Sequence, residues 1–305
     1  MADRDSTPVR IFAYILPRTI SSALSKCLSG VDGMEIWFER FTRAFFVRQE
    51  YELQTGDDMP MEYEGNEEKV QEAAKLFRRF IGTDIVPDKV VYGNVKRELQ
   101  ASTSKYIFAK EGYFAFSDAK SRQYIPGGFK HVFLIRDPCR LFTSYRKAIY
   151  KHLTSVGIRT GDALDEEAFD IERDDPIMNA NEFYKGIVEL WKYVRDNVDP
   201  DPIVINTDDL LANPAEMLSK FCHLTGLPYS DSLLEWNASP DITKTWKVAS
   251  DEVLEKAFPF YGTALYSSKF QPPKPPVRKD RLAPDIRKLS EASLPYFEEM
   301  NKFKI

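Results

Sequence analysis

The sequence predicts an α/β fold in which helices cover both faces of a central parallel sheet. Five short apolar runs rich in β-branched and aromatic residues alternate with longer segments of helical spacing. The run His131–Ile135 is apolar after its first residue, as expected for a strand covered on both faces. Polar residues follow four of the five runs, where parallel sheets bind ligands. The length of 305 residues allows one large α/β domain or two smaller ones, and we expect a single domain over residues 1–305.

The first predicted unit is a strand, a turn and a helix within Val9–Leu28. Apolar residues from Val9 to Leu16 predict the strand, Pro17 ends it, and the spacing of Ala23, Leu24, Cys27 and Leu28 predicts the helix. Such a turn directs backbone N–H groups and the positive end of a helix dipole at one point, which suits a phosphate or sulfate group. In the alternative interpretation, the serines of the turn only cap an ordinary helix.

The remaining elements follow from the same patterns. The further strands are predicted at Met34–Phe38, Tyr106–Ala109, His131–Ile135 and Pro202–Ile205. Helices are predicted at 67–81, after Pro138, and at 182–198, 213–226 and 284–303. The acidic segment 51–68 predicts a surface excursion, and the proline-rich segment 267–283 predicts an extended strap.

Composition excludes several classes of protein. Charged residues make up 29% of the chain and the net charge is −5, so neither a nucleic-acid partner nor a disordered chain is predicted. No apolar run is long enough to cross a bilayer, and the charged first residues do not resemble a secretory signal. The three cysteines are odd in number and lack the spacing of metal ligands, which fits buried thiols in a reducing compartment. We therefore expect a cytoplasmic protein. We expect neither a metal nor a membrane partner. The sequence gives no indication of the oligomeric state.

Three segments carry a resemblance to a known family. They read P-R-T-I-S-S-A-L at 17–24, F-L-I-R-D-P-C-R-L-F-T-S-Y at 133–145, and V-I-N-T-D-D-L-L-A-N-P-A-E-M-L at 204–218. Together they resemble the sulfotransferases that use 3′-phosphoadenosine 5′-phosphosulfate (PAPS), and the first is closest to a divergent branch with a P-R-[NT]-[IV]-S-[ST]-A loop. The resemblance implies a three-layer, P-loop-like domain. It also implies transfer of a sulfonate from PAPS to a hydroxyl of a small molecule, leaving 3′-phosphoadenosine 5′-phosphate (PAP), without a metal.

The resemblance also assigns residues to the sulfonate donor. The 5′-phosphosulfate loop corresponds to Arg18, Thr19, Ile20, Ser21, Ser22 and Ala23. Arg136 at a strand end and Ser144, eight positions later, correspond to the residues that bind the 3′-phosphate. Ser267, Ser268 and Phe270 correspond more loosely to a nucleotide-binding segment, to which Arg278, Lys279 and Arg281 could add charge. A nucleotide with two separated anionic groups requires two anion sites at neighbouring strand ends, in agreement with this assignment.

Four residues are candidates for the chemistry. Arg18 is expected to stabilise the charge that grows on the leaving oxygen, and Lys110 to contact the transferring sulfonate. Glu39 is the first candidate for the base, because relatives with this loop tend to carry a glutamate near the end of the second strand; alternatively, Arg40 could neutralise it in an ion pair. Glu111 is the second candidate, because the cytosolic branch has a histidine in K-T-H where this chain has K-E-G. The histidines are predicted to be structural or on the surface: His131, His152 and His223.

Two other functions remain open at this point. A P-loop kinase or phosphotransferase is disfavoured, because the sequence lacks G-x-x-x-x-G-K-[ST] and an acidic strand end that would bind magnesium beside the loop. A catalytically degenerate nucleotide-binding protein is also possible, because Ile20 replaces a glycine common among relatives. The acceptor is not identified, and Trp37, Phe38, Phe45 and Phe46 could line its pocket or belong to the core.

Overall fold

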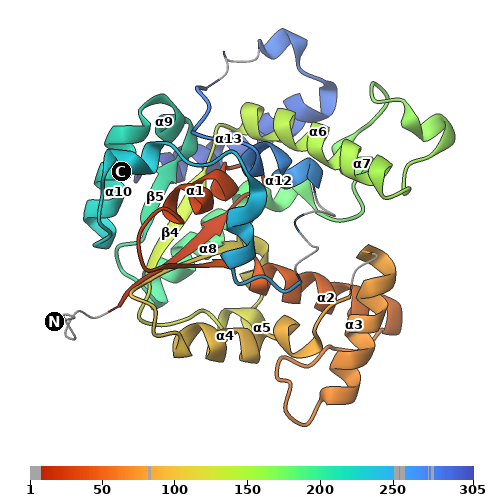
Figure 1. Ribbon diagram of the computed structural model, residues 1–305. Coiled ribbons are helices and arrows are strands. Elements are labelled where there is room, and N and C mark those ends of the chain that lie inside the picture. Colours follow the sequence, from red (N-terminus) through yellow and green to blue (C-terminus); the bar gives the residue numbers. More distant parts are fainter. Residues whose placement is uncertain (1–7, 82–83, 251–253, 255–257, 274, 276–277) are drawn as a thin grey trace.

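A single parallel sheet organises the chain (Figure 1). The structure is a computed structural model, and it describes residues 8–81, 84–250, 254, 258–273, 275 and 278–305. The five strands lie in the order β2-β3-β1-β4-β5. Their bounds are Val9–Ile15 for β1, Met34–Phe38 for β2, Tyr106–Gly112 for β3, Lys130–Ile135 for β4 and Ile203–Asn206 for β5.

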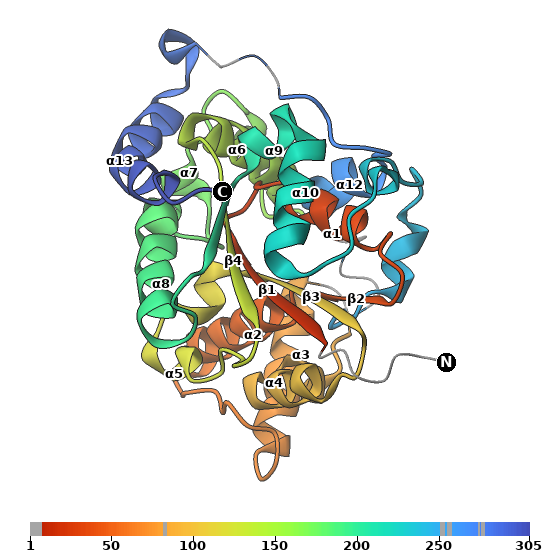
Figure 2. The same ribbon diagram turned by 90° about the vertical axis from the view of Figure 1, so that its left-hand side faces the viewer.

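Helices cover both faces of this sheet, so the molecule has three layers (Figure 2). On one face lie α1 (Ser21–Leu28), α9 (Thr207–Ala212), α10 (Pro214–Thr225) and α12 (Phe258–Leu265). On the other lie α2 (Arg40–Thr55), α4 (Tyr92–Ala101), α6 (Pro138–Ser155), α8 (Phe183–Asn197) and α13 (Pro284–Asn301). The helix α3 (Glu67–Ile81) packs on α2, and the short helices are α5 (Ala119–Arg122) and α7 (Ile171–Asp174).

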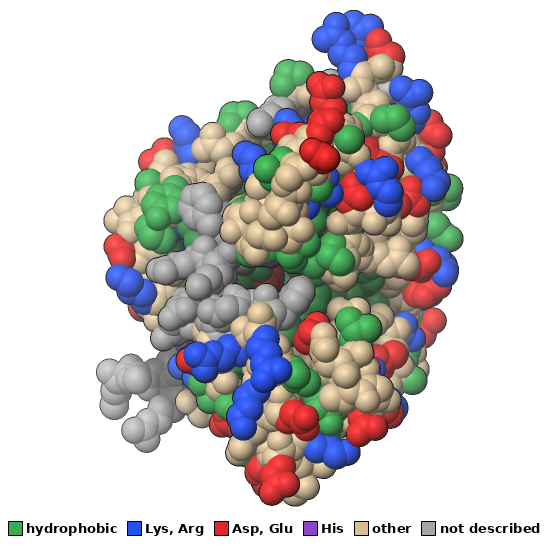
Figure 3. Space-filling model, turned by 90° about the vertical axis from the view of Figure 1, so that its right-hand side faces the viewer, with side chains coloured by type: hydrophobic (Ala, Val, Ile, Leu, Met, Phe, Trp, Pro, Cys, Tyr) green, Lys and Arg blue, Asp and Glu red, His purple; other side chains and the backbone are tan. Residues whose placement is uncertain are grey.

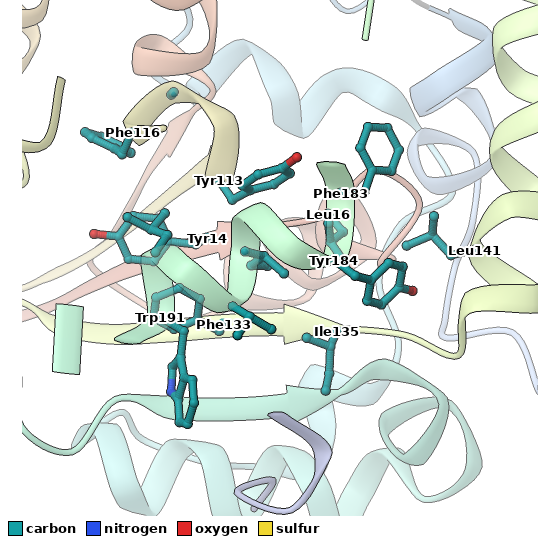
Figure 4. Close-up of a cluster of buried hydrophobic side chains, with 14 of the residues drawn as sticks. Tyr14, Leu16, Tyr113, Phe116, Phe133, Ile135, Leu141, Phe183, Tyr184 and Trp191 are labelled. Carbon is teal, nitrogen blue, oxygen red and sulfur yellow. The ribbon is translucent and has the colours of Figure 1, made fainter. Parts of the chain in front are cut away.

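The central strand β1 supplies side chains to both cores. Phe12 and Tyr14, together with Leu16 just after the strand, point into the core beneath α2 and α8, while alternate residues such as Ile11 and Ala13 point into the core beneath α1 and α10. All five are fully buried, as expected for a strand covered on both faces. Figure 4 shows Tyr14 and Leu16 among aromatic and aliphatic side chains of other elements.

The register brings the ends of three strands together. Ile15, the last residue of β1, pairs with Gly112 of β3 on one side and with Leu134 of β4 on the other. After β1 the chain first builds the β2–β3 side of the sheet and then crosses to the β4–β5 side. The carboxyl end of β1 is therefore the switch point at which open α/β sheets bind their ligands.

The predicted α/β architecture is confirmed, and all five predicted strands are present. The predicted end of β3 at Ala109 is wrong: the strand continues to Gly112, so Lys110 and Glu111 lie within it instead of after it. Two long helices, α2 and α4, were not predicted. Neither begins with a side-chain cap, which removes the usual sequence signal for a helix start.

The two predicted irregular segments differ in part from the structure. Residues 51–55 of the predicted excursion form the last turn of α2, and Tyr51 is buried, so only 56–66 connect α2 to α3. In the predicted strap, residues 267–273 form no helix, residues 279–281 form a short 3-10 turn, and 274, 276 and 277 lie outside the described residues. Over the described parts of the chain, no helix combines the length and apolar character needed to cross a membrane.

Candidate active site

A cavity of about 810 Å³ opens at the carboxyl ends of the strands. Figure 3 views the side of the molecule between α2 and α3 below and α6 and α7 above, and this side is hollowed, with hydrophobic side chains around the hollow. Most of the residues predicted for the site line the cavity, namely Arg18, Ile20, Ser21, Ser22, Ala23, Glu39, Lys110, Arg136, Ser144, Ser267 and Phe270. Thr19, Glu111 and Ser268 are not among the residues that line it.

The loop after β1 adopts an unusual backbone. Arg18 and Ile20 both have positive φ, 68° and 51°, and Ile20 is the N-cap of α1. The left-handed region is uncommon for any residue with a side chain and rare for a β-branched one, whereas glycine adopts it freely. The loop therefore has at Ile20 the conformation that glycine would favour, and this turn directs the N-terminus of α1 at the cavity.

Thr19 stabilises this loop from behind. Its hydroxyl donates a hydrogen bond of 2.7 Å to the carbonyl of Leu16, and the residue is fully buried. The hydroxyl is thus used by the backbone of the turn and not presented to the cavity. Lys26 similarly connects α1 to the C-terminal segment, because its ammonium donates to the carbonyls of Leu265 and Ser267.

Arg18 and Arg136 lie side by side. The Nε of Arg18 donates to Ser144 Oγ at 3.0 Å, and its Nη1 donates to the carbonyl of Phe260. The Nη1 of Arg136 donates to the carbonyl of Arg18 at 2.9 Å. Burial, with the neighbouring Arg136 guanidinium as a second cause, lowers the pKa of Arg18 to about 10, so it remains a cation at neutral pH. Two adjacent cations favour the binding of an anion between or beside them.

A carboxylate anchors Arg136 from the side of β5. Its Nε lies 3.4 Å from Asp208 Oδ1, and Asp208 Oδ2 accepts a 3.0 Å hydrogen bond from the backbone N–H of Asp137. Asp137 in turn caps α6 by accepting from the backbone N–H of Arg140 at 3.0 Å. Arg18 thus contacts both members of the predicted Arg136–Ser144 pair, Ser144 through its guanidinium and Arg136 through its carbonyl oxygen.

Glu39 and Lys110 form a buried ion pair at the ends of β2 and β3. The Lys110 ammonium donates to Glu39 Oε1, and the Tyr261 hydroxyl donates to Glu39 Oε2. Glu39 has a φ of 55°, and its backbone N–H donates to the carbonyl of Lys110 at 2.9 Å. The ammonium also lies over the Phe38 ring, 4.0 Å from its centroid. Burial lowers the pKa of Lys110, while Glu39 opposes that shift.

Glu111 faces the opposite side of β3 from Lys110. Its Oε2 accepts hydrogen bonds from the backbone N–H and the hydroxyl of Thr42, at 2.7 and 2.8 Å. The Thr42 hydroxyl also accepts from the backbone N–H of Gly112 at 2.7 Å. Burial raises the pKa of Glu111 to about 7. The structure therefore places Glu111 as an anchor for the first turn of α2.

Several lining residues had not been identified from the sequence. Tyr261 and Phe260 come from α12, far from the loop in sequence, and no local pattern indicates their position. Arg43 follows Glu39 by one helical turn, and that relation was hidden because α2 was not predicted. Basic residues on one face of α6 also line the cavity and could have been found from their helical spacing with Ser144: Arg140, Lys147 and Lys151.

Some of the histidines and candidate aromatic residues line the cavity, and others are buried in the cores. His131 is buried in β4, 3.1 Å from the Tyr14 hydroxyl, and burial lowers its pKa to about 4. His152, predicted to be structural or on the surface, lines the cavity. Of the four aromatic candidates for an acceptor pocket only Phe46 lines the cavity, while the others pack in the cores: Trp37, Phe38 and Phe45.

Comparison with known proteins identifies a family over part of the chain. The family model described as a sulfotransferase domain matches residues 191–302, from α8 to the end of α13. No curated protein sequence matches the chain.

Solved sulfotransferase structures are similar at low sequence identity. The sulfotransferase domain of the Synechococcus PCC 7002 olefin synthase is 14% identical, with 94% of this chain and 95% of that chain covered and a TM-score of 0.42. The sulfotransferase domain from the curacin biosynthetic pathway is 13% identical, with 94% and 98% covered and a TM-score of 0.41. A sulfotransferase from Alicyclobacillus acidocaldarius is 14% identical, with 86% and 97% covered and a TM-score of 0.43.

The family match and the sequence motifs cover different parts of the chain. The motifs at 17–24 and 133–145 precede the matched range, and the motif at 204–218 lies inside it. The predicted resemblance to the sulfotransferases is confirmed by the sulfotransferase-domain match over residues 191–302.

Proposed function

We propose that the protein transfers a sulfonate group from PAPS to a hydroxyl of a small-molecule acceptor. One observation carries the proposal: a single cavity collects cations from the ends of β1 and β4 and a carboxylate–lysine pair from the ends of β2 and β3. A donor with two anionic groups requires the first set, and a proton-accepting centre for a hydroxyl requires the second.

The donor half of the cavity would hold the nucleotide. We define it as Arg18, Ser21, Ser22, Arg136 and Ser144. The start of α1 and Arg18 would bind the 5′-phosphosulfate, and Arg136 with Ser144 would bind the 3′-phosphate. In the structure these cations donate to oxygens of the chain itself, including Ser144 Oγ and the carbonyl of Phe260. A bound nucleotide would take over some of these donors, so its anions replace existing acceptors.

The acceptor half would carry out the proton transfer. We define it as Glu39, Arg43, Phe46, Lys110 and Tyr261. The acceptor oxygen would attack sulfur in line, forming the new O–S bond while the bond from sulfur to the bridging phosphate oxygen breaks. Glu39 would take the proton of the hydroxyl, and the electron pair of the broken bond would leave on PAP. Arg18 would stabilise the charge that develops on that oxygen, with Lys110 beside the transferring sulfonate.

Nucleotide binding is the first test. Thermal stabilisation should be measured with PAP, with adenosine 5′-monophosphate, and with ATP plus magnesium. We expect a clear shift of the melting temperature with PAP and a smaller one with the monophosphate, which lacks the 3′-phosphate. A response to ATP plus magnesium alone would overturn the proposal in favour of a phosphotransferase.

Transfer of labelled sulfonate is the second test. With radiolabelled PAPS and a panel of phenols and alcohols, we expect label to appear in at least one acceptor and the Arg18→Met variant to lose that transfer. If PAP stabilises the chain but label never moves, a nucleotide-binding protein without catalysis replaces the proposal. Arg195, partly exposed in the last turn of α8 and absent from the cavity lining, provides a control variant, Arg195→Met, that should bind PAP and transfer sulfonate like the original chain.

A further inference from the structure

One face of α2 presents three different chemistries to the cavity. Glu39 is the N-cap of the helix, and Arg43 and Phe46 follow it at helical spacing; all three line the cavity. Residues four apart on a helix have Cβ atoms about 5–6 Å apart. A carboxylate, a cation and an aromatic ring therefore succeed one another along one wall.

Arg43 differs from the other arginines of the same helix. Arg40 is paired with Glu98 at 3.1 Å, and Arg48 is paired with Glu52 and Asp118, each at 2.9 Å. Within the described residues, the Arg43 guanidinium makes no such hydrogen bond or ion pair, and its contact is the Phe77 ring, 5.6 Å from the centroid. Burial lowers the pKa of Arg43, with Glu39 and Tyr261 opposing that shift. A partly buried cation without a bonded anion is costly unless a ligand supplies one.

The cavity that Arg43 lines also contains apolar side chains and one unsatisfied polar atom. Phe46 and Phe114 pack with their centroids 5.4 Å apart, and both line the cavity together with Ile177 and Met178. His152 lines it as well, and its Nδ1 is buried without a hydrogen-bond partner among the described residues. The Arg43 charge contributes, after burial, to lowering the pKa of His152, so the two groups lie near each other. A polar group of a ligand would find both a cation and a free ring nitrogen here.

We propose that the acceptor is an amphipathic hydroxy acid. Its hydroxyl would lie at Glu39, its carboxylate would bind the Arg43 guanidinium about one helical turn away, and its apolar part would pack on Phe46 and Phe114. The inference rests on the proposed function, because it assumes that Glu39 marks the reacting end. A guanidinium binds a carboxylate through two parallel hydrogen bonds, and the water-poor wall strengthens that contact. A neutral sugar would leave the cation without an anion and the aromatic wall without an apolar partner.

Matched pairs of acid and amide test the inference without requiring turnover. The probes are 4-hydroxyphenylacetate with 4-hydroxyphenylacetamide, and ω-hydroxydecanoate with ω-hydroxydecanamide, bound to the PAP-loaded full chain and measured by calorimetry. We expect at least one acid to bind roughly 10- to 100-fold more tightly than its amide, the range for a hydrogen bond to a charged group. In Arg43→Met, which keeps the aliphatic stem over Phe77, this ratio should fall to about one. Arg43→Lys should retain part of it.

The outcomes separate this inference from the proposed function. If PAP stabilises the chain and acids and amides bind equally, or none of the four binds, the acceptor inference is overturned while the donor assignment stands. If Arg43→Met abolishes stabilisation by PAP, Arg43 belongs to the donor site and the inference is likewise overturned. If PAP fails to stabilise the chain but the same pairs, measured without nucleotide, show an Arg43-dependent preference for the acid, the donor assignment fails and anion recognition at Arg43 stands.

Discussion

The donor half and the acceptor half of the cavity are built in different ways. In the donor half, short segments at the ends of β1 and β4 set the geometry through the backbone, and Arg18 and Arg136 already donate to oxygens of the chain. In the acceptor half, one face of α2 and a tyrosine of α12 set the geometry through side chains, and Arg43 has no bonded anion among the described residues. Under the proposed function, the first half would be preorganised for an anionic ligand, whereas the second would leave a charge for the ligand to complete.

Replacing Glu39 should have the largest effect on turnover. Glu39→Gln removes the proposed base while keeping the shape, so kcat should fall about 100- to 10,000-fold, the usual range for general base catalysis. The affinity for PAP, measured by calorimetry, should change less than threefold, because Glu39 lies in the acceptor half. A large loss of PAP affinity would show that the two halves are not separate.

Tyr261→Phe is the matched control for Glu39. It removes only the hydrogen bond that the tyrosine hydroxyl donates to Glu39 Oε2, leaving the Lys110 contact in place. We expect a smaller loss of kcat than in Glu39→Gln, on the order of tenfold, the value of about one hydrogen bond.

Replacing Arg136 should lower the affinity for PAP, whereas replacing Glu39 should lower kcat. Arg136→Met should weaken PAP binding about 10- to 100-fold, because a charged hydrogen-bonding partner of the phosphate is lost. Asp208→Asn is the matched variant: it keeps the cation and weakens its anchor, so PAP affinity should fall less than tenfold. Equal losses in the two variants would indicate that the arginine acts through the fold and does not bind the nucleotide.

The pH dependence of stability should report on Glu111. Its pKa is about 7 in the folded protein against 4.5 for the free group, so between these values the folded state holds a proton that the unfolded state has released. The free energy of unfolding should therefore fall as pH rises from about 4.5 to about 7. In Glu111→Gln this component of the slope should be absent in denaturant titrations across that range. If the slope is unchanged in Glu111→Gln, a group other than Glu111 causes the pH dependence of stability.

Replacing Ile20 should have the smallest effect. Ile20→Gly relieves a left-handed backbone but loses the packing of the side chain and increases the freedom of the unfolded chain, so stability should change by no more than about 1 kcal/mol. PAP affinity should stay within threefold, because the loop already has the conformation that glycine favours. A tenfold gain in affinity would show that the isoleucine side chain obstructs the nucleotide.

The donor half of the cavity could be predicted from the sequence more completely than the acceptor half. The donor half depends on residues within 17–24 and 133–145, where short motifs and strand–helix spacing are visible in the sequence. The strands were predicted for a similar reason, because their apolar runs are local. Thr19 was the exception in the loop: its residue type suggested a ligand, but its hydroxyl donates to the Leu16 carbonyl.

The acceptor half was predicted only in part: Glu39, Phe46 and Lys110 were candidates, whereas Arg43 and Tyr261 were missed because their positions depend on distant parts of the chain. The helix α2 begins at Arg40, and its N-cap, Glu39, has a positive φ and makes no side-chain cap, so no start signal precedes the helix. Lys110 and Glu111 suggested the end of β3, yet the strand continues, with Lys110 paired to Glu39 and Glu111 accepting hydrogen bonds from Thr42. Tyr261 reaches Glu39 from 222 positions away, a contact that no local pattern encodes.

The pairing of β1 also has a consequence for how the chain folds during synthesis. Val9 pairs with Tyr106, and Phe12 pairs with Ala109 on one side and His131 on the other. Because both neighbours of β1 are encoded about a hundred residues later, the first strand emerges from the ribosome long before it can join the sheet. A nascent chain that stops before residue 106 should leave 9–16 exposed to proteases, whereas one extended past 135 has every strand that borders the donor loop.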